Sequence, residues 1–545
     1  MQNSGTRNSN RVYFYRMFSA QTLPYDRTHS FSRIVTDYLS GSEALAAFYR
    51  YRPDLEGVRA ALEARRAAPQ HRATLVAALR HQYRSVEQSH VVDANIDALL
   101  DENTFTVTTA HQPNLLTGPL YFLYKILHAV RLSATLQEQL PGHRFVPVFY
   151  MGSEDADLDE LNHFSIEGKR YTWATKQQGA VGRMLVDKEI SALLKGVEGQ
   201  VSGLPNGAEL LSLLRGCFQE GRSIQDATFG LVHALFARFG LVVLIADEAR
   251  LKAVMQPVFE ADLFRQESSE IVSRTSERLQ EHYNVQAHPR AINLFYLEGN
   301  TRARIEQRGD RYHVLQTGLS FSRDELQREL AQHPERFSPN VILRGLYQET
   351  ILPNVAFIGG GGELAYWLQL QDLFAHYAVP FPVLLLRNSF LLVNMQQKEL
   401  ADSLGLDGEA LFLTELEQMN RHLARTGQQP QLNGEVRELG ALYEQLRAAA
   451  SAVDSTLDQH VTALKTRSLH LVEELEKKMQ RAARRHEAAT QRQLHKLKEQ
   501  LFPKGGLQER SENFSAFYAR YGDAFIDGLY RHSGALDQQF TVVYL

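Results

Sequence analysis

The sequence predicts an α/β protein with a parallel sheet at its centre, two inserts and a long helical arm. Three observations lead to this fold class. Between about residues 104 and 390, short apolar strands alternate with amphipathic helices, which is typical of a parallel α/β sheet. Two stretches rich in turn residues interrupt this alternation, and beyond residue 391 the pattern is almost purely helical. The composition, with 44% apolar and 22% charged residues in 545, is that of a globular protein.

The first βαβ unit follows an N-terminal helical region. Residues 1–30 are rich in Asn, Ser and Arg and are predicted to form a poorly ordered lead-in. Apolar residues at three- and four-residue spacing predict helices over residues 41–102. The β-branched run Thr104–Ala110 predicts the first strand. A helix from about Gly118 to Leu140 and a strand over Val146–Tyr150 then complete the unit.

Three further strands continue the alternation. They are predicted over Leu241–Ala246, Ala356–Ile358 and Pro382–Leu386, and a helical run over Glu363–Tyr377 separates the last two. We therefore assign residues 31–390 to one core.

Both inserts carry turn signals. Ser165–Trp173 predicts a hairpin within an insert near 163–215. Asn293–Ser320 predicts a meander within a second insert near 265–340, and Ser322 with Glu325 predicts a capping box at the next helix.

Residues 391–508 are predicted to form a helical arm, and residues 509–545 to return to the core. An apolar seam without glycine or proline predicts an antiparallel coiled coil that forms a homodimer through about 434–502. The basic residues of the arm are interleaved with glutamates, so a solvated coiled-coil face is a better interpretation than a nucleic-acid surface.

Composition excludes several classes of protein. The net charge of −4 and the pI of about 6.6 argue against a nucleic-acid partner. The longest apolar runs, such as Phe239–Ala246 and Val379–Leu386, fall short of the ~20 residues of a membrane helix. The single cysteine, Cys217, excludes an internal disulfide framework and favours a reducing, cytoplasmic location.

Polar residues follow the first predicted strand. His111 and Gln112 stand at its carboxyl end, where open α/β sheets bind their ligands. Thr117 is a candidate N-cap for the next helix, and the amides at Thr117 and Gly118 would suit a phosphate or carboxylate. The alternative is a loop in which His111 and Gln112 bridge backbone groups.

An acidic loop follows the second strand. It contains Ser153, Glu154, Asp155 and Asp157 and leads to Asn162-His163. Its carboxylates could bind Mg²⁺, bind a substrate amine or act as a base. The alternative is an acidic helix N-terminus, which would account for Asp159 and Glu160.

Two later strands also end in candidate site residues. Gly359–Gly362 would let the backbone approach a ligand, although tight strand–helix packing explains four glycines equally well. Arg387, in Arg387-Asn388-Ser389, could clamp a carboxylate.

Together these motifs resemble the bacillithiol biosynthesis cysteine-adding enzyme family, BshC. The resemblance spans about residues 30–545 and rests on HQPNLLTGPLYFLYK, GSEDADLDELNH, RGLYQETILPNVAFIGGGGELAYWLQL, LLLRNSF and NFSAFYARYGDAFIDGLY. It implies a Rossmann-like, nucleotidyltransferase-like core with two inserts, a dimerising coiled-coil arm, and a ligase that adds L-cysteine to glucosaminyl-malate to form bacillithiol.

The motifs supply the candidate site residues. Candidates for catalysis are His111, Glu154, Asp155 and Asp157. Candidates for substrate binding are Gln112, Tyr121, Ser153, Asn162, His163, Gln348, Glu363, Trp367, Arg387 and Ser389. Candidates for nucleotide binding are Thr117, Gly118, Gly359, Gly360, Gly361 and Gly362. No residue is assigned to a metal.

Forming an amide from a carboxylate at neutral pH requires an activated acyl group, so we expect ATP as the activator, with Mg²⁺ as a candidate ion. The resemblance to class I synthetases places Thr117-Gly118-Pro119 beneath the ATP phosphates, whereas HxGH and a KMSKS-like loop are absent. Another ATP-dependent ligase or nucleotidyltransferase on the same core is the alternative function, and a non-enzymatic coiled-coil adaptor is a further one.

Overall fold

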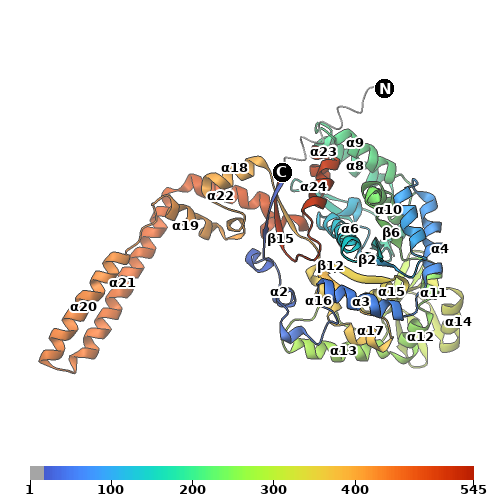
Figure 1. The fold of residues 1–545 in the computed structure, drawn as a ribbon, viewed down its shortest axis with the longest axis horizontal. Helices are drawn as coiled ribbons and strands as arrows, with labels where there is room; N and C mark the ends of the chain where they lie inside the picture. The colour runs from blue at the N-terminus through green and yellow to red at the C-terminus, as the bar shows by residue number, and fades with distance from the viewer. Residues whose placement is uncertain (1–17) are drawn as a thin grey trace. The chain divides into compact units, whose positions relative to one another are not determined.

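In the computed structural model, which describes residues 18–545, a five-stranded parallel sheet forms the centre of the core (Figure 1). Its order is β13-β12-β2-β3-β6. In chain order the strands are β2 (Thr104–His111), β3 (Arg144–Met151), β6 (Val242–Ile245), β12 (Asn354–Gly359) and β13 (Val383–Leu386). Each of the five overlaps a strand predicted from the sequence, and the predicted α/β fold class is confirmed.

Strand β2 shows why this sequence forms a central strand. Its residues from Thr104 to Thr109 are buried, as expected for a parallel sheet covered on both faces. Three of the buried threonine hydroxyls are hydrogen-bonded: Thr106 and Thr108 donate to Asn354 Oδ1, and Thr109 donates to the Ile358 carbonyl.

Helices cover both faces of the sheet. Figure 1 shows α6 (Tyr121–Gln139) and α10 (Ile224–Phe236) on one side and α3 (Leu55–Ala67) and α15 (Val341–Ile351) on the other. Apolar side chains of α3, α6 and the sheet form a common core. Each large apolar side chain buried there contributes roughly 1.5–3 kcal/mol.

The order of the strands creates one topological switch point. From β2 the chain adds β3 and β6 on one side, and it then places β12 and β13 on the other side of β2. Ligands of such sheets bind at the carboxyl ends of the strands where the order reverses. In this sheet the switch point lies between the carboxyl ends of β2 and β12.

Two sequence predictions need correction at the level of elements. The helix predicted over 363–377 is two helices, α16 (Gly361–Trp367) and α17 (Gln371–His376). Between them Gln369 is buried, and its side chain bonds to backbone and side-chain groups of residues 276–287. The predicted lead-in 1–30 is ordered from Ser19, where β1 (Ser19–Leu23) joins a sheet with β15 (Phe540–Tyr544). Residues 1–17 lie outside the described part.

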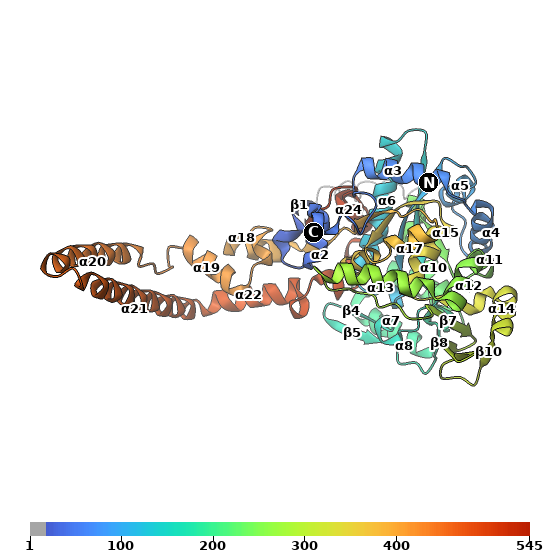
Figure 2. The same ribbon diagram turned by 90° about the horizontal axis from the view of Figure 1, so that it is seen from below.

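The inserts follow the carboxyl ends of β3 and β6. The first contains the predicted hairpin, β4 (His163–Ile166) and β5 (Lys169–Thr172), and then α8 (Lys188–Val201) and α9 (Gly207–Cys217). The second contains the predicted meander; its strands are β7 (Leu294–Glu298), β8 (Thr301–Arg308), β9 (Arg311–Val314) and β10 (Ser320–Ser322). The helix α14 (Arg323–Gln332) begins with the predicted Ser322–Glu325 capping box. Figure 2 shows hairpin and meander on the same side of the core.

The chain folds into two compact units. The core unit holds the described residues up to Leu391 together with Gly506–Val543, and the arm unit holds Leu392–Gly505 with the last two residues. The C-terminal part of the core unit contains α23 (Ser515–Tyr521) and α24 (Asp523–His532).

The arm unit is mostly helical. Its helices are α18 (Met395–Leu404), α19 (Glu415–Arg425), α20 (Asn433–Val453), α21 (Leu457–His486) and α22 (Ala488–Leu501). Figures 1 and 2 show α20 and α21 side by side, as the coiled-coil prediction requires. The seam predicted as unbroken is interrupted at Glu487, where the backbone leaves the helical region. Within residues 18–545, no helix is both long and apolar enough to cross a membrane.

Candidate active site

The predicted motif loops meet at the carboxyl edge of the sheet. In the register of the strands, His111 at the end of β2 pairs with Met151, and Gly359 at the end of β12 pairs with Leu386. The Gly152 amide donates to the His111 carbonyl, which holds the first two motif loops together. The loops after β2, β3, β12 and β13 therefore lie at the same edge of the sheet.

His111 lies at the switch point in an aromatic setting. Its ring lies 5.3 Å from that of Tyr121 and 5.5 Å from that of Phe122, measured between centroids. The Nδ1 atom is 3.2 Å from the Gln112 carbonyl, so Nδ1 carries the proton and Nε2 is left as an acceptor. Burial and the nearby Lys125 ammonium lower the pKa of His111 well below its usual range. His111 is therefore neutral at pH 7.

Lys125, on α6, is a buried cation beside this histidine. Its ammonium donates to the Ala110 carbonyl at 2.8 Å and forms an ion pair with Glu363. Burial lowers the pKa of Lys125, and Glu363 opposes that shift. Glu363 in turn accepts a hydrogen bond from the Gly360 amide, so this pair ties α6 to the glycine-rich turn.

Arg387, predicted to clamp a substrate carboxylate, already holds a carboxylate of the protein. Its guanidinium donates to Glu509 at 2.6 Å and to Ser389 Oγ at 3.0 Å, and both charged side chains are buried. The guanidinium also lies 5.2 Å from the centre of the Tyr121 ring. A bidentate clamp on a substrate would require this internal ion pair to open.

Asp155 is the carboxylate of the acidic loop that lies nearest to His111 in the hydrogen-bond network. Gln112 donates to its Oδ2 at 3.2 Å, and Arg344 of α15 does so at 3.3 Å. Burial acts to raise the pKa of Asp155, but Arg344 and Arg302 lower it to about 2. Asp155 is therefore charged at neutral pH, and its side chain is 19% exposed.

Glu154 has a different environment from its neighbour. It pairs at 2.5 Å with Lys252, a fully buried cation that also pairs with Asp247 at 2.9 Å. Arg183 adds two bonds to Asp247. Glu154 is thus held in an internal network, which leaves Asp155 as the more available acid.

The loop between β2 and α6 does not form the predicted phosphate site at Thr117 and Gly118. Their amides donate to the carbonyls of Asn114 and Leu115. Helix α6 begins at Tyr121, with no side-chain cap, and the Thr117 hydroxyl has no hydrogen-bond partner among the described residues. The predicted Thr117 N-cap is therefore wrong. Leu116, Thr117 and Gly118 all have positive φ, so the backbone makes a left-handed turn before the helix begins.

The glycine-rich turn serves close packing. None of its four glycines, Gly359–Gly362, has positive φ. A Cβ on Gly359 would meet Phe357 at 2.9 Å, and one on Gly361 would meet Val35 at 3.1 Å, whereas one on Gly362 would meet no atom within 4 Å. The amides of Gly361 and Gly362 open the first turn of α16 and have no acceptor within the helix.

Two predicted substrate-binding residues lie elsewhere. Gln348 donates to Glu349, which pairs with Arg65 and Asn354 at the amino end of β12, so Gln348 belongs to the opposite edge. Trp367 is buried and stacks on Phe357 with 4.4 Å between ring centres. The prediction that Gln348 and Trp367 bind substrate is therefore wrong, because both side chains are buried in the interior of the protein.

Asp157, Asn162 and His163 have local partners, whereas the Ser153 hydroxyl has none among the described residues. Asp157 accepts from the Glu160 amide as the N-cap of α7 (Leu158–Leu161). The Nδ1 atom of His163 lies 3.1 Å from the Asp159 carbonyl oxygen and 3.4 Å from Asn162 Oδ1. Ser153 is buried. The helix-N-terminus alternative thus accounts for Asp157.

Sequence reasoning missed four charged partners of the edge: Lys125, Lys252, Arg344 and Glu509. Lys125 could have been found, because it is a lone cation in the apolar run YFLYKILHAV. Arg344 stands inside the RGLYQET motif. Nothing in the sequence near Glu509 indicates its partner.

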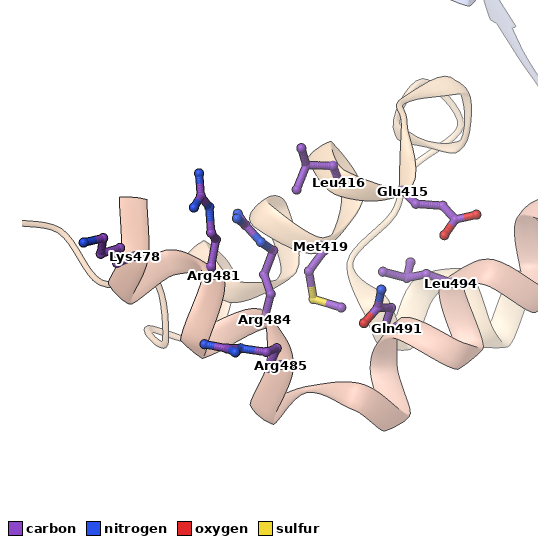
Figure 3. Close-up of a pocket in the computed structure, with 9 residues that line it drawn as sticks. All are labelled: Glu415, Leu416, Met419, Lys478, Arg481, Arg484, Arg485, Gln491 and Leu494. Atoms are coloured by element: carbon purple, nitrogen blue, oxygen red, sulfur yellow. The ribbon is translucent and has the colours of Figure 1, made fainter. Parts of the chain in front are cut away.

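A pocket of about 800 Å³ lies in the arm unit, apart from these residues (Figure 3). Lys478, Arg481, Arg484 and Arg485 line it, with Leu416 and Met419 of α19 among its apolar residues. It contains none of the predicted site residues.

In the part of the chain that the structure describes, no three His, Cys, Asp or Glu side chains are grouped to hold a metal ion.

Comparison with known proteins agrees with the fold and the motifs. Residues 18–388 match the model of the bacillithiol biosynthesis BshC N-terminal Rossmann-like domain, and residues 390–545 match that of the BshC C-terminal coiled-coil domain. A relative from Flavobacterium johnsoniae is 37% identical, with 96% of this chain and 99% of its own length covered. One from Cytophaga hutchinsonii is 37% identical, with 92% and 94% covered. Both carry the name "Putative cysteine ligase BshC". The chain belongs to the BshC family of cysteine ligases of bacillithiol biosynthesis.

Proposed function

We propose that this ligase joins L-cysteine to glucosaminyl-malate at the carboxyl edge between β2, β3 and β12. The observation that carries the proposal is the meeting of a neutral histidine, His111, with a charged acid, Asp155, and several buried cations at one edge. The names of the relatives support the cysteine ligase activity. The choice of glucosaminyl-malate rests on the family resemblance.

The charges at the edge are complementary to these substrates. Cysteine carries one amine and one carboxylate, and glucosaminyl-malate carries an amine and two carboxylates. Asp155 offers a partner for an ammonium group, and Arg344, whose side chain is 25% exposed, offers a partner for a carboxylate. The ion pair of Arg387 with Glu509 is buried, whereas that of Arg344 with Asp155 is partly exposed and can open to a substrate, so we assign to Arg344 the role that the sequence assigned to Arg387.

His111 is the better candidate for the proton acceptor when the sugar amine attacks. Its Nε2 is unprotonated at neutral pH and carries a lone pair, which is what a base must offer. Burial and Lys125 lower the pKa of His111 and so weaken it as a base, but Asp155, with a pKa of about 2, is also a weak base and already accepts hydrogen bonds from Gln112 and Arg344. We therefore assign proton transfer to His111 and charge complementarity to Asp155.

ATP is proposed as the activator of the cysteine carboxylate on chemical grounds, since hydroxide is a poor leaving group. The residues at Thr117 and Gly118 do not fit a phosphate, because their amides are bonded within the loop. Of the predicted nucleotide contacts, the first-turn amides of Gly361 and Gly362 are the ones without an acceptor among residues 18–545.

The test is a reaction of the full-length protein with L-cysteine, glucosaminyl-malate and ATP, with and without Mg²⁺, followed by mass spectrometry. We expect the mass of bacillithiol, and none when either organic substrate is omitted. Formation of AMP or ADP in step with product would support ATP activation. Product with another amino acid in place of cysteine would favour the alternative ligase, and turnover without any nucleotide would contradict the ATP proposal.

A further inference from the structure

The segment Gln508–Asn513 follows the arm directly in the sequence and belongs to the core unit, where four of its six side chains are buried. Glu509 and Asn513 are fully buried, and Glu512 is nearly so. A buried carboxylate costs free energy unless it is paired and hydrogen-bonded, so its partners matter.

Glu509 bonds to the end of β13. Its Oε1 accepts from Arg387 at 2.6 Å and from Ser389 Oγ at 3.3 Å, while Oε2 accepts from the Phe390 amide at 3.3 Å. The guanidinium of Arg387 is thereby fixed next to the Tyr121 ring, which itself lies beside His111.

Asn513 and Glu512 bond to the loop that follows β2. The Asn513 amide group donates to the carbonyls of Leu116 and Gly118, at 2.9 and 2.6 Å. The Leu120 amide donates to the Glu512 carbonyl at 2.8 Å. These bonds hold a loop whose backbone is in the left-handed region at Leu116, Thr117 and Gly118. Such conformations persist where the surroundings over-determine them.

We propose that Gln508–Asn513 is the positioning element of the site, in which Glu509 orients Arg387 and Asn513 fixes the loop between His111 and Tyr121. None of these residues needs to touch substrate. The inference rests on the proposed placement of the ligase chemistry at this edge.

The chain offers a matched control for Glu509. Glu349 is equally buried and also pairs with an arginine, Arg65, at 2.6 Å, but it lies at the opposite edge of the sheet. Glu509→Gln and Glu349→Gln each remove one charge from a buried ion pair with little change in shape. Both should lower the Tm by several degrees, because each leaves a buried guanidinium uncompensated.

The experiment follows hydrogen exchange of the Phe390 amide, which donates to Glu509, and of the Thr117, Gly118 and Leu120 amides of the loop, in the full-length protein, together with kcat and KM. In Glu509→Gln we expect these amides to exchange at least tenfold faster and kcat/KM to fall at least tenfold. In Glu349→Gln, measured where both variants are folded, exchange at these amides and kcat/KM should stay within about twofold of the parent.

The outcomes separate this inference from the proposed function. Unchanged exchange in Glu509→Gln, or equal losses in both variants, would overturn the positioning role. Faster exchange with unchanged turnover would instead overturn the placement of the chemistry at this edge. Should Glu509→Gln not fold, Asn513→Ala gives the same readout through the Leu116 and Gly118 carbonyls, and unchanged exchange there would overturn the inference equally.

Discussion

Asp155 and Glu154 are neighbours in the sequence, yet their different surroundings suit them to different roles. Glu154 is held by Lys252, which is fully buried, whereas Asp155 is partly exposed and bonded to Gln112 and Arg344. Buried ion pairs of the first kind maintain structure, and a partly exposed charge of the second kind can exchange its partner for a substrate.

Asp155→Asn should keep the fold and reduce product formation roughly 10- to 100-fold, the range for loss of one charged hydrogen bond. The change preserves shape and removes charge. Product mass and far-UV circular dichroism measure the two effects. Asp159→Asn, at an exposed position in the same loop, is the control and should retain its activity. Full activity in the Asp155 variant would exclude that charge from the mechanism.

His128 should make the core sensitive to acid. It is buried on α6, where Nδ1 accepts from the Asn388 amide and Nε2 donates to the Ala535 carbonyl. Burial lowers its pKa to about 4. Since the folded value lies below the unfolded one of about 6.5, the stabilising effect is complete above pH 6.5 and is lost as the pH falls through 4.

Urea unfolding followed by tryptophan fluorescence measures this effect in the core unit, which contains both Trp173 and Trp367. Between pH 7 and pH 4 the parent should lose roughly 3 kcal/mol more unfolding free energy than His128→Gln. His460→Gln, at an exposed position in the arm, should behave as the parent. An identical pH dependence in the parent and the His128 variant would refute the assignment.

At the scale of elements, the loop from β2 to α6 depends on one glycine. Gly118 has φ 61° and ψ −137°, a region open essentially to glycine, and an added Cβ would lie 2.8 Å from Asn114 Cβ. The conformation of this loop therefore depends on a residue with no side chain.

Gly118→Ala should lower the free energy of unfolding by about 1–3 kcal/mol and reduce turnover, because the loop adjoins His111 and Tyr121. Thermal unfolding and product mass are the measurements. Gly199→Ala, at an exposed position of α8 with no atom within 4 Å of the new Cβ, should leave the protein as stable or stabilise it by up to about 1 kcal/mol. Equal stability of the two variants would mean that the loop is not strained by a side chain at 118.

The strands, and the polar residues at their carboxyl ends, could be predicted because the sequence patterns that indicate them are local. Apolar β-branched runs followed by polar residues, as at Thr104–His111, are readable within ten residues. The partners of Arg387 and Gly118 could not be predicted, because Glu509 and Asn513 lie more than a hundred positions away. The Thr117 cap failed for the same reason: the left-handed turn before α6 is held by distant residues.

At the scale of the whole molecule, the arm leaves apolar side chains in solvent. Among the described residues, none in α20 or α21 is buried, and Leu471 and Leu475 are 62% and 52% exposed. Two helices that bury no residue gain little stabilising free energy by packing only against each other. A second copy of the chain, packed on this face, would supply the missing burial, which is why we propose a homodimer through the arm.

The double change Leu471→Glu with Leu475→Glu should convert the dimer to a monomer, since each buried leucine contributes roughly 1.5–3 kcal/mol. Light scattering after size exclusion gives the mass, and the circular dichroism of the core should persist. Leu100→Glu, an equally exposed leucine of the core unit, is the matched control and should leave the mass unchanged. A monomeric parent at micromolar concentration would contradict the dimer.

The ion pair between Arg387 and Glu509 has a consequence for how the arm can vary. Arg387 lies just before the chain leaves the core unit at Leu391, and Glu509 lies just after it returns at Gly506. The ion pair therefore holds the two ends of the arm segment together, as in a closed loop. The entropy of closing a loop grows with the logarithm of its length, at about 0.6 kcal/mol per doubling. Lengthening or shortening the arm should therefore change the stability of the core very little. A flexible linker that bridges these two points should preserve the ion pair, and with it the sheet edge.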